Sequence, residues 1–126
     1  MANINASIEV SAKHVHDSKL TDTMLPRGTR VYITDVGVDP VDALIGAARK
    51  VTDMGYQAVP HIPARRIESL AALEHRLSGM AQEGGVQDIL IIAGEADEQM
   101  GPYSETLGVL QTGLIDKLGF KHVAVG

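Results

Sequence analysis

Short apolar runs alternate along the chain with longer segments in which apolar residues recur every three or four positions. The runs with the residue types of β-strands begin near Ile8, Val31, Gln57, Asp88 and Lys121. Every interval between them can hold the crossover of about a dozen or more residues that joins parallel strands. This alternation is typical of βαβ units and predicts an α/β fold with five parallel strands.

The crossover after the second strand carries the clearest helix signal. Asp39 is predicted as the N-cap and Pro40 as the first helical residue, because proline lacks the N–H that would stay unpaired there. The apolar stripe that follows consists of Val41, Leu44, Ile45, Ala48 and Val51. Gly55 is predicted to end the helix, since glycine readily adopts the left-handed conformation found beyond helix ends.

The next helix is predicted between Ile67 and the pair Gly84-Gly85. Its apolar stripe consists of Leu70, Leu73, Leu77 and Met80. Its polar face is expected to carry Glu68, Glu74, His75, Arg76 and Gln82. The spacing of three and four residues indicates a helix that packs one face against a core.

A further helix is predicted from a Ser104 cap to Gly119. Its stripe consists of Leu107, Leu110, Leu114, Ile115 and Leu118. The first crossover, from His14 to Leu25, has only a partial stripe and ends at a Pro-Arg-Gly turn. We therefore expect that crossover to be largely loop.

Composition and charge narrow the function classes. The chain has 126 residues, 11 basic and 16 acidic side chains, a formal charge of −5 and no cysteine. Residues 1–126 are expected to form a single domain that buries about two-thirds of the unfolded surface. The absence of cysteine excludes disulfides and thiolate sites. Without a basic run or an apolar run of about 20 residues, we expect no nucleic-acid or membrane partner. The lack of cysteine, and an N-terminus without the charged-then-apolar layout of a signal peptide, predict a cytoplasmic protein.

Polar residues stand at the carboxyl ends of the predicted strands. In parallel α/β folds these ends meet at one edge of the sheet, where binding and catalysis take place. The residues at these positions are Glu9, Thr34, Asp35, His61, Gly94 and Glu95. We expect them to lie close together in a parallel sheet.

Glu9 alternates with Ile8 and Val10, so its side chain is directed to the opposite face of the first strand. In a barrel that face is the interior, where burial would favour the protonated carboxyl group of a general acid. A carboxylate that faces water is the other interpretation, because glutamate is rarely buried. The residue pattern leaves both open.

His14 and His16 follow the first strand with the spacing at which two imidazoles reach one cation in metal-dependent amidohydrolase barrels. Such a site needs further ligands, for which His61 and Asp35 are the candidates. Two histidines that cap a helix or face solvent are the alternative, and the shortness of the motif favours it.

His61 stands between Pro60 and Pro63, which restrict the backbone on both sides. A rigid imidazole at a strand end favours contact with a ligand, and a ring bonded to nearby backbone is the equally weighted alternative.

Arg65 and Arg66 follow this strand end in the sequence. Their guanidinium groups could hold carboxylate or phosphate, but a solvated first helical turn is the favoured interpretation.

Several segments carry a resemblance to a known family. They are Ser7-Ile8-Glu9-Val10, Pro60-His61-Ile62-Pro63-Ala64-Arg65, Ile91-Ile92-Ala93-Gly94-Glu95 and Gly101-Pro102-Tyr103-Ser104. In this order and at these separations they resemble the methylenetetrahydrofolate reductase family over essentially the whole chain. The likeness is closest to a bacterial branch, in which Ala12-Lys13-His14-Val15 and residues 26–33 also have counterparts.

The resemblance implies a TIM (β/α)8 barrel with non-covalent FAD, which passes a hydride between NAD(P)H and the one-carbon unit of folate. It makes Glu9 the general acid that protonates folate and promotes opening of its five-membered ring to an iminium. It places Thr34 near nicotinamide and flavin, and Glu95 near flavin and the substrate's pterin. It lines the flavin with His61, Gly94, Tyr103 and Ser104. It also implies a role in one-carbon metabolism and methionine biosynthesis, and leaves the direction of hydride transfer open.

The chain also departs from the family pattern. Glu95 stands in place of an aspartate, Ala93 in place of an arginine, and Ser11-Ala12-Lys13-His14 in place of an aromatic-and-proline continuation. Because a full barrel takes about 250 residues, we interpret the chain as a barrel truncated after the fifth strand and expect a homo-oligomer. The alternatives are a metal-dependent hydrolase that uses His14 and His16, and a non-catalytic half-barrel that binds folate or oligomerises.

Overall fold

The computed structural model describes residues 8–35, 37–92, 108 and 112–125. The strands are β1 (Ile8–Ser11), β2 (Arg30–Thr34), β3 (Gln57–Pro63), β4 (Asp88–Ile92) and β5 (His122–Val125). The helices are α1 (Ala12–His16), α2 (Val41–Asp53), α3 (Leu70–Gln82) and α5 (Leu114–Leu118), with a 3-10 helix, η1, over Ala64–Arg66. Strands and helices alternate along the chain, as the apolar pattern predicts.

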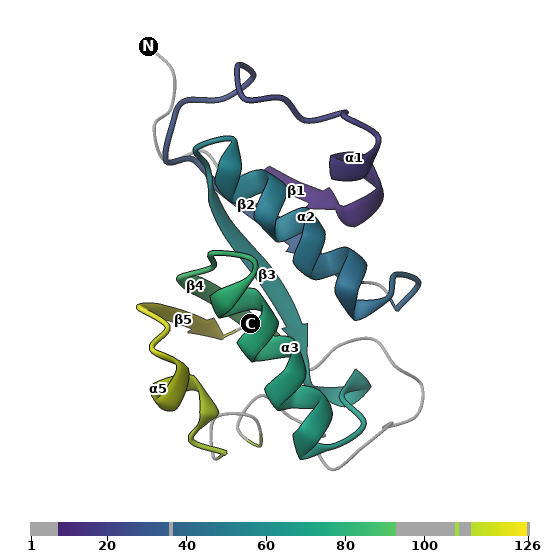
Figure 1. The fold of residues 1–126 in the computed structure, drawn as a ribbon, viewed down its shortest axis with the longest axis vertical. Helices are drawn as coiled ribbons and strands as arrows, with labels where there is room; N and C mark the ends of the chain where they lie inside the picture. The colour runs from purple at the N-terminus through teal and green to yellow at the C-terminus, as the bar shows by residue number, and fades with distance from the viewer. Residues whose placement is uncertain (1–7, 36, 93–107, 109–111, 126) are drawn as a thin grey trace.

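The five strands form one parallel sheet in the order β1-β2-β3-β4-β5. This confirms the predicted α/β fold with five parallel strands. Each strand pairs with the next one in the chain, so successive crossovers advance in the same direction. Right-handed connections then place the crossover helices on one face of the sheet, and Figure 1 shows α2 and α3 together in front of the strands.

The hydrophobic core lies between the helices and this covered face of the sheet. The strands contribute Val10, Val31, Ile33, Ala58, Ile62, Ile89 and Ile91. The two long helices contribute Leu44, Ile45, Ala48, Val51, Leu73, Leu77 and Met80. Since burial of one large apolar side chain stabilises a fold by about 1.5–3 kcal/mol, this layer holds the helices against the sheet.

Helix α2 begins one residue later than the sequence predicts. Pro40 is its N-cap residue, with φ −62° and ψ 151°, and no side chain makes a capping hydrogen bond. The prediction of Asp39 as the N-cap is therefore wrong, because the extended backbone of Pro40 leaves Asp39 outside the helix. Gly55 follows the helix with φ 93°, as predicted.

Helix α3 is capped by Ser69, whose Oγ accepts a hydrogen bond from the backbone N of Ala72 at 3.1 Å. Leu73, Leu77 and Met80 of the predicted stripe are buried. Leu70, by contrast, is 53% exposed. The expected solvent position of Arg76 is also wrong: the residue is buried, because its guanidinium group pairs with the buried carboxylate of Asp35.

The single helix predicted from Ser104 to Gly119 is not what the structure shows. Gly113 adopts a left-handed conformation with φ 75° directly before α5, so no continuous helix crosses this position. Leu114 and Ile115 are buried as predicted, and Gly119 ends the helix with φ 77°. Ser104, Leu107 and Leu110 lie outside the described residues.

The first crossover is largely loop, as predicted, because its only helix is α1, which has five residues. Tyr56 ties this crossover to the start of β3. Its hydroxyl donates to the carbonyl of Thr21 at 2.5 Å and accepts from the backbone N of Leu25 at 3.1 Å. Within the described ranges, no helix has the length and apolar character needed to span a bilayer.

Candidate functional site at the carboxyl ends of the strands

The sheet face away from the helices carries the polar residues of the strands. Along β2, Val31 and Ile33 enter the hydrophobic core. Because side chains alternate along a strand, Arg30, Tyr32 and Thr34 project from the opposite face. We call this opposite side the open face of the sheet.

Four side chains gather at the carboxyl half of the open face. Glu9 pairs in register with Tyr32, and Tyr32 pairs with Val59 of β3. His61 follows Val59 by two residues and is directed to the same face. The rings of Tyr32 and His61 meet edge-on, with their centroids 6.2 Å apart and their planes inclined by 63°. We call Glu9, Tyr32, Thr34 and His61 the carboxyl-end cluster.

The cluster contains Glu9, Thr34 and His61 of the predicted site residues, whereas Asp35 is buried in a pair with Arg76. Thr34 ends β2, and its Oγ1 donates to the carbonyl of Val10 on the neighbouring strand at 3.3 Å. Glu9 and His61 come from the two strands that flank β2. Tyr32 is an addition, since the strand pattern assigns it no function. The other predicted residues, Gly94, Glu95, Tyr103 and Ser104, lie outside the described residues.

Glu9 is exposed on the open face. Within the described residues this agrees with the interpretation in which the carboxyl group faces water, and its burial inside a complete barrel stays a prediction. Glu9 nevertheless lies close enough to His61 for its negative charge to act on the imidazole. The carboxyl group is thus part of the same site while remaining accessible to a ligand.

Burial lowers the pKa of His61 below its ordinary value of 6.5. The negative charges of Glu9 and Asp35 act in the opposite direction, but the loss of hydration outweighs them. His61 is therefore mainly neutral at neutral pH, where one ring nitrogen donates and the other accepts a hydrogen bond. A neutral imidazole can therefore form hydrogen bonds with the polar groups of an uncharged ligand.

We expect His61 to make the protein less stable as the pH falls. Between the lowered folded pKa and 6.5, the unfolded chain binds more protons at this residue than the folded chain does. Its contribution to stability is therefore complete above pH 6.5 and is lost as the pH falls through that window. In urea unfolding between about pH 5 and 8, His61→Gln should show a smaller loss of stability on acidification than the unmodified chain. Equal losses in the two proteins would contradict this assignment.

His14 and His16 are held by backbone groups. Nδ1 of His14 accepts a hydrogen bond from the backbone N of Ser11 at 3.3 Å, and Oγ of Ser11 accepts from the backbone N of His14 at 3.2 Å. This reciprocal pair is a capping box for α1. Nε2 of His16 lies 3.0 Å from the carbonyl oxygen of Ala43 on α2. These contacts confirm the capping interpretation for His14.

The described part of the chain contains no group of three or more His, Asp or Glu side chains placed to hold a metal ion. Asp35, the proposed additional ligand, has other partners. Its Oδ2 lies 2.7 Å from Nη1 of Arg76, and its Oδ1 accepts from the backbone N of Gly37 at 2.9 Å. The described geometry thus lends no support to a metal-dependent hydrolase at His14 and His16.

A hollow of about 390 Å³ opens on the amino half of the open face, between β2 and β5. Tyr32 lines it and connects it to the carboxyl-end cluster. Asp88 is buried in its wall, with Oδ1 2.8 Å from Nδ1 of His122 and Oδ2 3.9 Å from Nε of Arg30. This group was missed by the sequence analysis, although each of its members is a polar residue at the start of an apolar strand.

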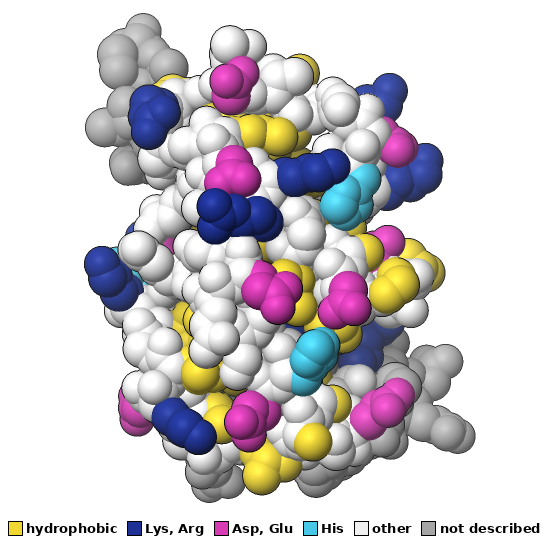
Figure 2. All heavy atoms as spheres, viewed as in Figure 1, with side chains coloured by type: hydrophobic (Ala, Val, Ile, Leu, Met, Phe, Trp, Pro, Cys, Tyr) yellow, Lys and Arg dark blue, Asp and Glu magenta, His cyan; other side chains and the backbone are white. Residues whose placement is uncertain are grey.

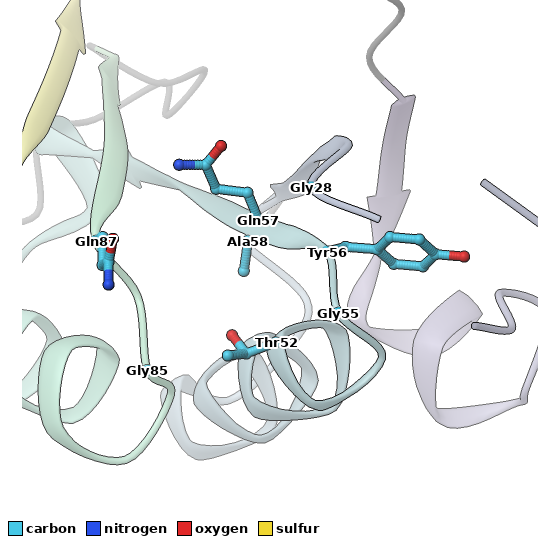
Figure 3. Close-up of a pocket in the computed structure, with 8 residues that line it drawn as sticks. All are labelled: Gly28, Thr52, Gly55, Tyr56, Gln57, Ala58, Gly85 and Gln87. Atoms are coloured by element: carbon cyan, nitrogen blue, oxygen red, sulfur yellow. The ribbon is translucent and has the colours of Figure 1, made fainter. Parts of the chain in front are cut away.

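A second hollow, of about 200 Å³, lies at the amino-terminal edge of the sheet, where β2, β3 and β4 begin (Figure 3). This edge is opposite to the one that carries the carboxyl-end cluster. Thr52 is one of its polar side chains, and it serves the fold. Thr52 lies on α2, and its Oγ1 contacts the carbonyl oxygens of Ala48 at 2.9 Å and Gly84 at 2.8 Å. In parallel α/β folds, binding and catalysis take place at the carboxyl ends of the strands rather than at this amino-terminal edge. The open face is therefore the stronger candidate.

The face that bears α2 and α3 shows interspersed charges. In Figure 2, basic and acidic side chains alternate over this face and are separated by small hydrophobic areas. Such mixing is typical of a solvated surface, because anion or cation binding is favoured by a field of one sign.

No model of a known protein family matches this chain.

Proposed function

We propose that this chain acts as a flavin-dependent oxidoreductase of the methylenetetrahydrofolate reductase type, which moves a hydride between NAD(P)H and the one-carbon unit of folate. The observation that carries the proposal is the carboxyl-end cluster on the open face of a parallel sheet. It combines an accessible carboxyl group, a hydroxyl, a neutral imidazole and an aromatic ring. These are the groups that a planar heterocyclic cofactor and a protonatable substrate require.

The topology supports a barrel wall as the scaffold. In doubly wound sheets the strand order reverses at a switch point and helices cover both faces. The five strands here follow one another without reversal, and α2 and α3 lie on the same face. The described βα units are proposed as the first five of a (β/α)8 barrel, with the open face as its interior.

The donor set of the cluster fits a flavin. FAD, when bound, would accept a hydride and pass it on. Its ring system has an apolar face, which Tyr32 can contact, and a polar edge, which Oγ1 of Thr34 and the neutral ring of His61 can bond. The edge-on contact between Tyr32 and His61 holds both rings in place before a ligand arrives.

Glu9 is proposed as the proton donor to folate. A ligand stacked on the open face would cover its carboxyl group and exclude water, and loss of hydration favours the protonated form. The proton would pass from the carboxyl group to the nitrogen of the five-membered folate ring that leaves when the ring opens. Because the same group can take the proton back, the assignment holds for either direction of the reaction.

The test is flavin binding followed by hydride transfer. Purified protein incubated with FAD and passed through a desalting column should retain the visible absorption of a flavin. NADH or NADPH should bleach this absorption, and 5,10-methylenetetrahydrofolate should restore it. A protein that retains no flavin contradicts the proposal, and one that binds folate without any bleaching supports the non-catalytic half-barrel instead.

A further inference from the structure

Two arginines follow the carboxyl end of β3, and neither forms an ion pair with an acidic side chain among the described residues. Arg65 and Arg66 form η1 together with Ala64, directly after Pro63 ends the strand. Ala64 and Ile67 on either side are buried, which fixes the position of this turn. Arg65 and Arg66 therefore project from a rigid segment rather than from a solvated helical turn.

One nitrogen of each guanidinium group is unsatisfied within the part of the chain that the structure describes. Nε of Arg65 and Nε of Arg66 are buried without a hydrogen-bond partner. Arg30, Arg49 and Arg76 each lie within 4.0 Å of a carboxylate oxygen, whereas no such pair involves Arg65 or Arg66. A buried donor without an acceptor has lost its hydration without compensation, so an acceptor supplied by a ligand would recover stabilisation here.

Arg66 also reaches the neighbouring strand end. Its guanidinium group lies against Gly37 in the segment between β2 and α2, where φ is 88°. A methyl group on Gly37 would overlap Nη1 of Arg66 and would lie 2.8 Å from its Cζ. Glycine at this position therefore leaves room for Nη1 of Arg66 against the backbone of the segment that follows β2.

The nearest buried carboxylate does not neutralise this charge. Both oxygens of Asp35 are already engaged, one by Arg76 at 2.7 Å and the other by the backbone N of Gly37 at 2.9 Å. The Asp35–Arg76 pair has no net charge, so Arg65 and Arg66 keep their two positive charges. These two arginines therefore carry positive charge at one place on a chain whose formal net charge is −5.

We propose that Arg65 and Arg66 form a binding site for an oxyanion, a phosphate or carboxylate group, at the carboxyl ends of β2 and β3. Guanidinium groups bind two oxygens at once through parallel N–H bonds, and this geometry matches phosphates and carboxylates. The site adjoins the carboxyl-end cluster through His61 on the same strand. It anchors the anionic part of a ligand whose uncharged part lies on the open face. The assignment needs no flavin and goes beyond the proposed redox function.

The test is calorimetric titration of the whole chain, without flavin, using inorganic pyrophosphate in one arm and glutarate in the other. Arg65→Gln/Arg66→Gln should weaken binding of the preferred anion by about 10- to 100-fold per lost guanidinium contact. Arg49→Gln, which removes an exposed charge on α2, is the matched control and should bind as the unmodified chain does. Stronger binding of pyrophosphate identifies a phosphate ligand, and stronger binding of glutarate identifies a carboxylate ligand.

Arg66→Lys provides a second variant that keeps the charge but removes the paired N–H groups. It should bind the preferred anion more weakly than the unmodified chain, and urea unfolding verifies that each variant is folded. The proposal is overturned if neither anion binds, or if Arg49→Gln weakens binding as much as the double variant. Because no flavin is added, these results are independent of the test for hydride transfer.

Discussion

Arg76→Met is expected to lower the free energy of unfolding by about 3–5 kcal/mol. The side chains of Arg76 and Asp35 are 9% and 4% exposed, and Nη1 lies 2.7 Å from Oδ2. Methionine fills a similar volume but leaves the Asp35 carboxylate buried without its counter-charge. Since domains of this kind are stable by about 5–15 kcal/mol, the variant should lose a large share of its stability in urea unfolding.

Two comparisons separate this effect from a general loss of packing. Asp35→Asn/Arg76→Met removes both charges and keeps Oδ1 for the backbone N of Gly37, so it should be more stable than Arg76→Met alone. Arg49→Met breaks an exposed pair with Asp53 on α2 and should change stability by less than about 0.5 kcal/mol. A double variant that is no more stable than Arg76→Met would show that lost packing, and not the buried charge, causes the destabilisation.

The position of Arg76 shows where periodicity reaches its limit. Three- and four-residue spacing correctly identified the buried Leu73, Leu77 and Met80, because apolar burial repeats with the helix. The same rule assigns any arginine on that helix to solvent. The burial of Arg76 depends on a carboxylate 41 residues earlier in the chain. A long-range pair of this kind leaves no periodic signal.

Chain spacing predicts the strands better than the apolar pattern predicts where a helix begins. The parallel direction of the five strands follows from chain spacing, since parallel crossovers need length that the sequence displays directly. Where α5 begins depends on one backbone angle at Gly113, and glycine is compatible with either conformation. The apolar stripe alone therefore predicted one continuous helix across Gly113.

The sequence predicts on which face of the sheet the candidate site lies, but it does not predict whether the side chains of that site are buried. Alternation correctly indicated that Glu9 faces away from Val10 and toward the side of the sheet where Tyr32 and His61 lie. Whether that side is buried depends on what covers the sheet, which alternation cannot specify. The same reasoning missed that Nε of Arg65 is buried without a partner among the described residues, because a sequence gives the number of charges but not their partners.

Glu9→Gln is expected to slow the folate-dependent step by about 10²- to 10⁴-fold, the range that general acid catalysis supplies. Glutamine keeps the size and hydrogen-bonding capacity of the side chain but cannot deliver the proton that opens the five-membered ring. Bleaching of bound flavin by NADH or NADPH should remain unchanged, because no folate nitrogen is protonated in that half of the reaction. Stopped-flow absorption measures the two halves separately.

Glu83→Gln is the matched control, since Glu83 is an exposed carboxylate at the end of α3 and away from the strands' carboxyl ends. It should leave both half-reactions unchanged. An equal loss of both half-reactions in Glu9→Gln would mean that Glu9 positions the flavin and does not protonate folate. A folate-dependent rate equal to that of the unmodified chain would remove Glu9 from the catalytic role, because the exposed carboxyl group would then contribute no proton to the reaction.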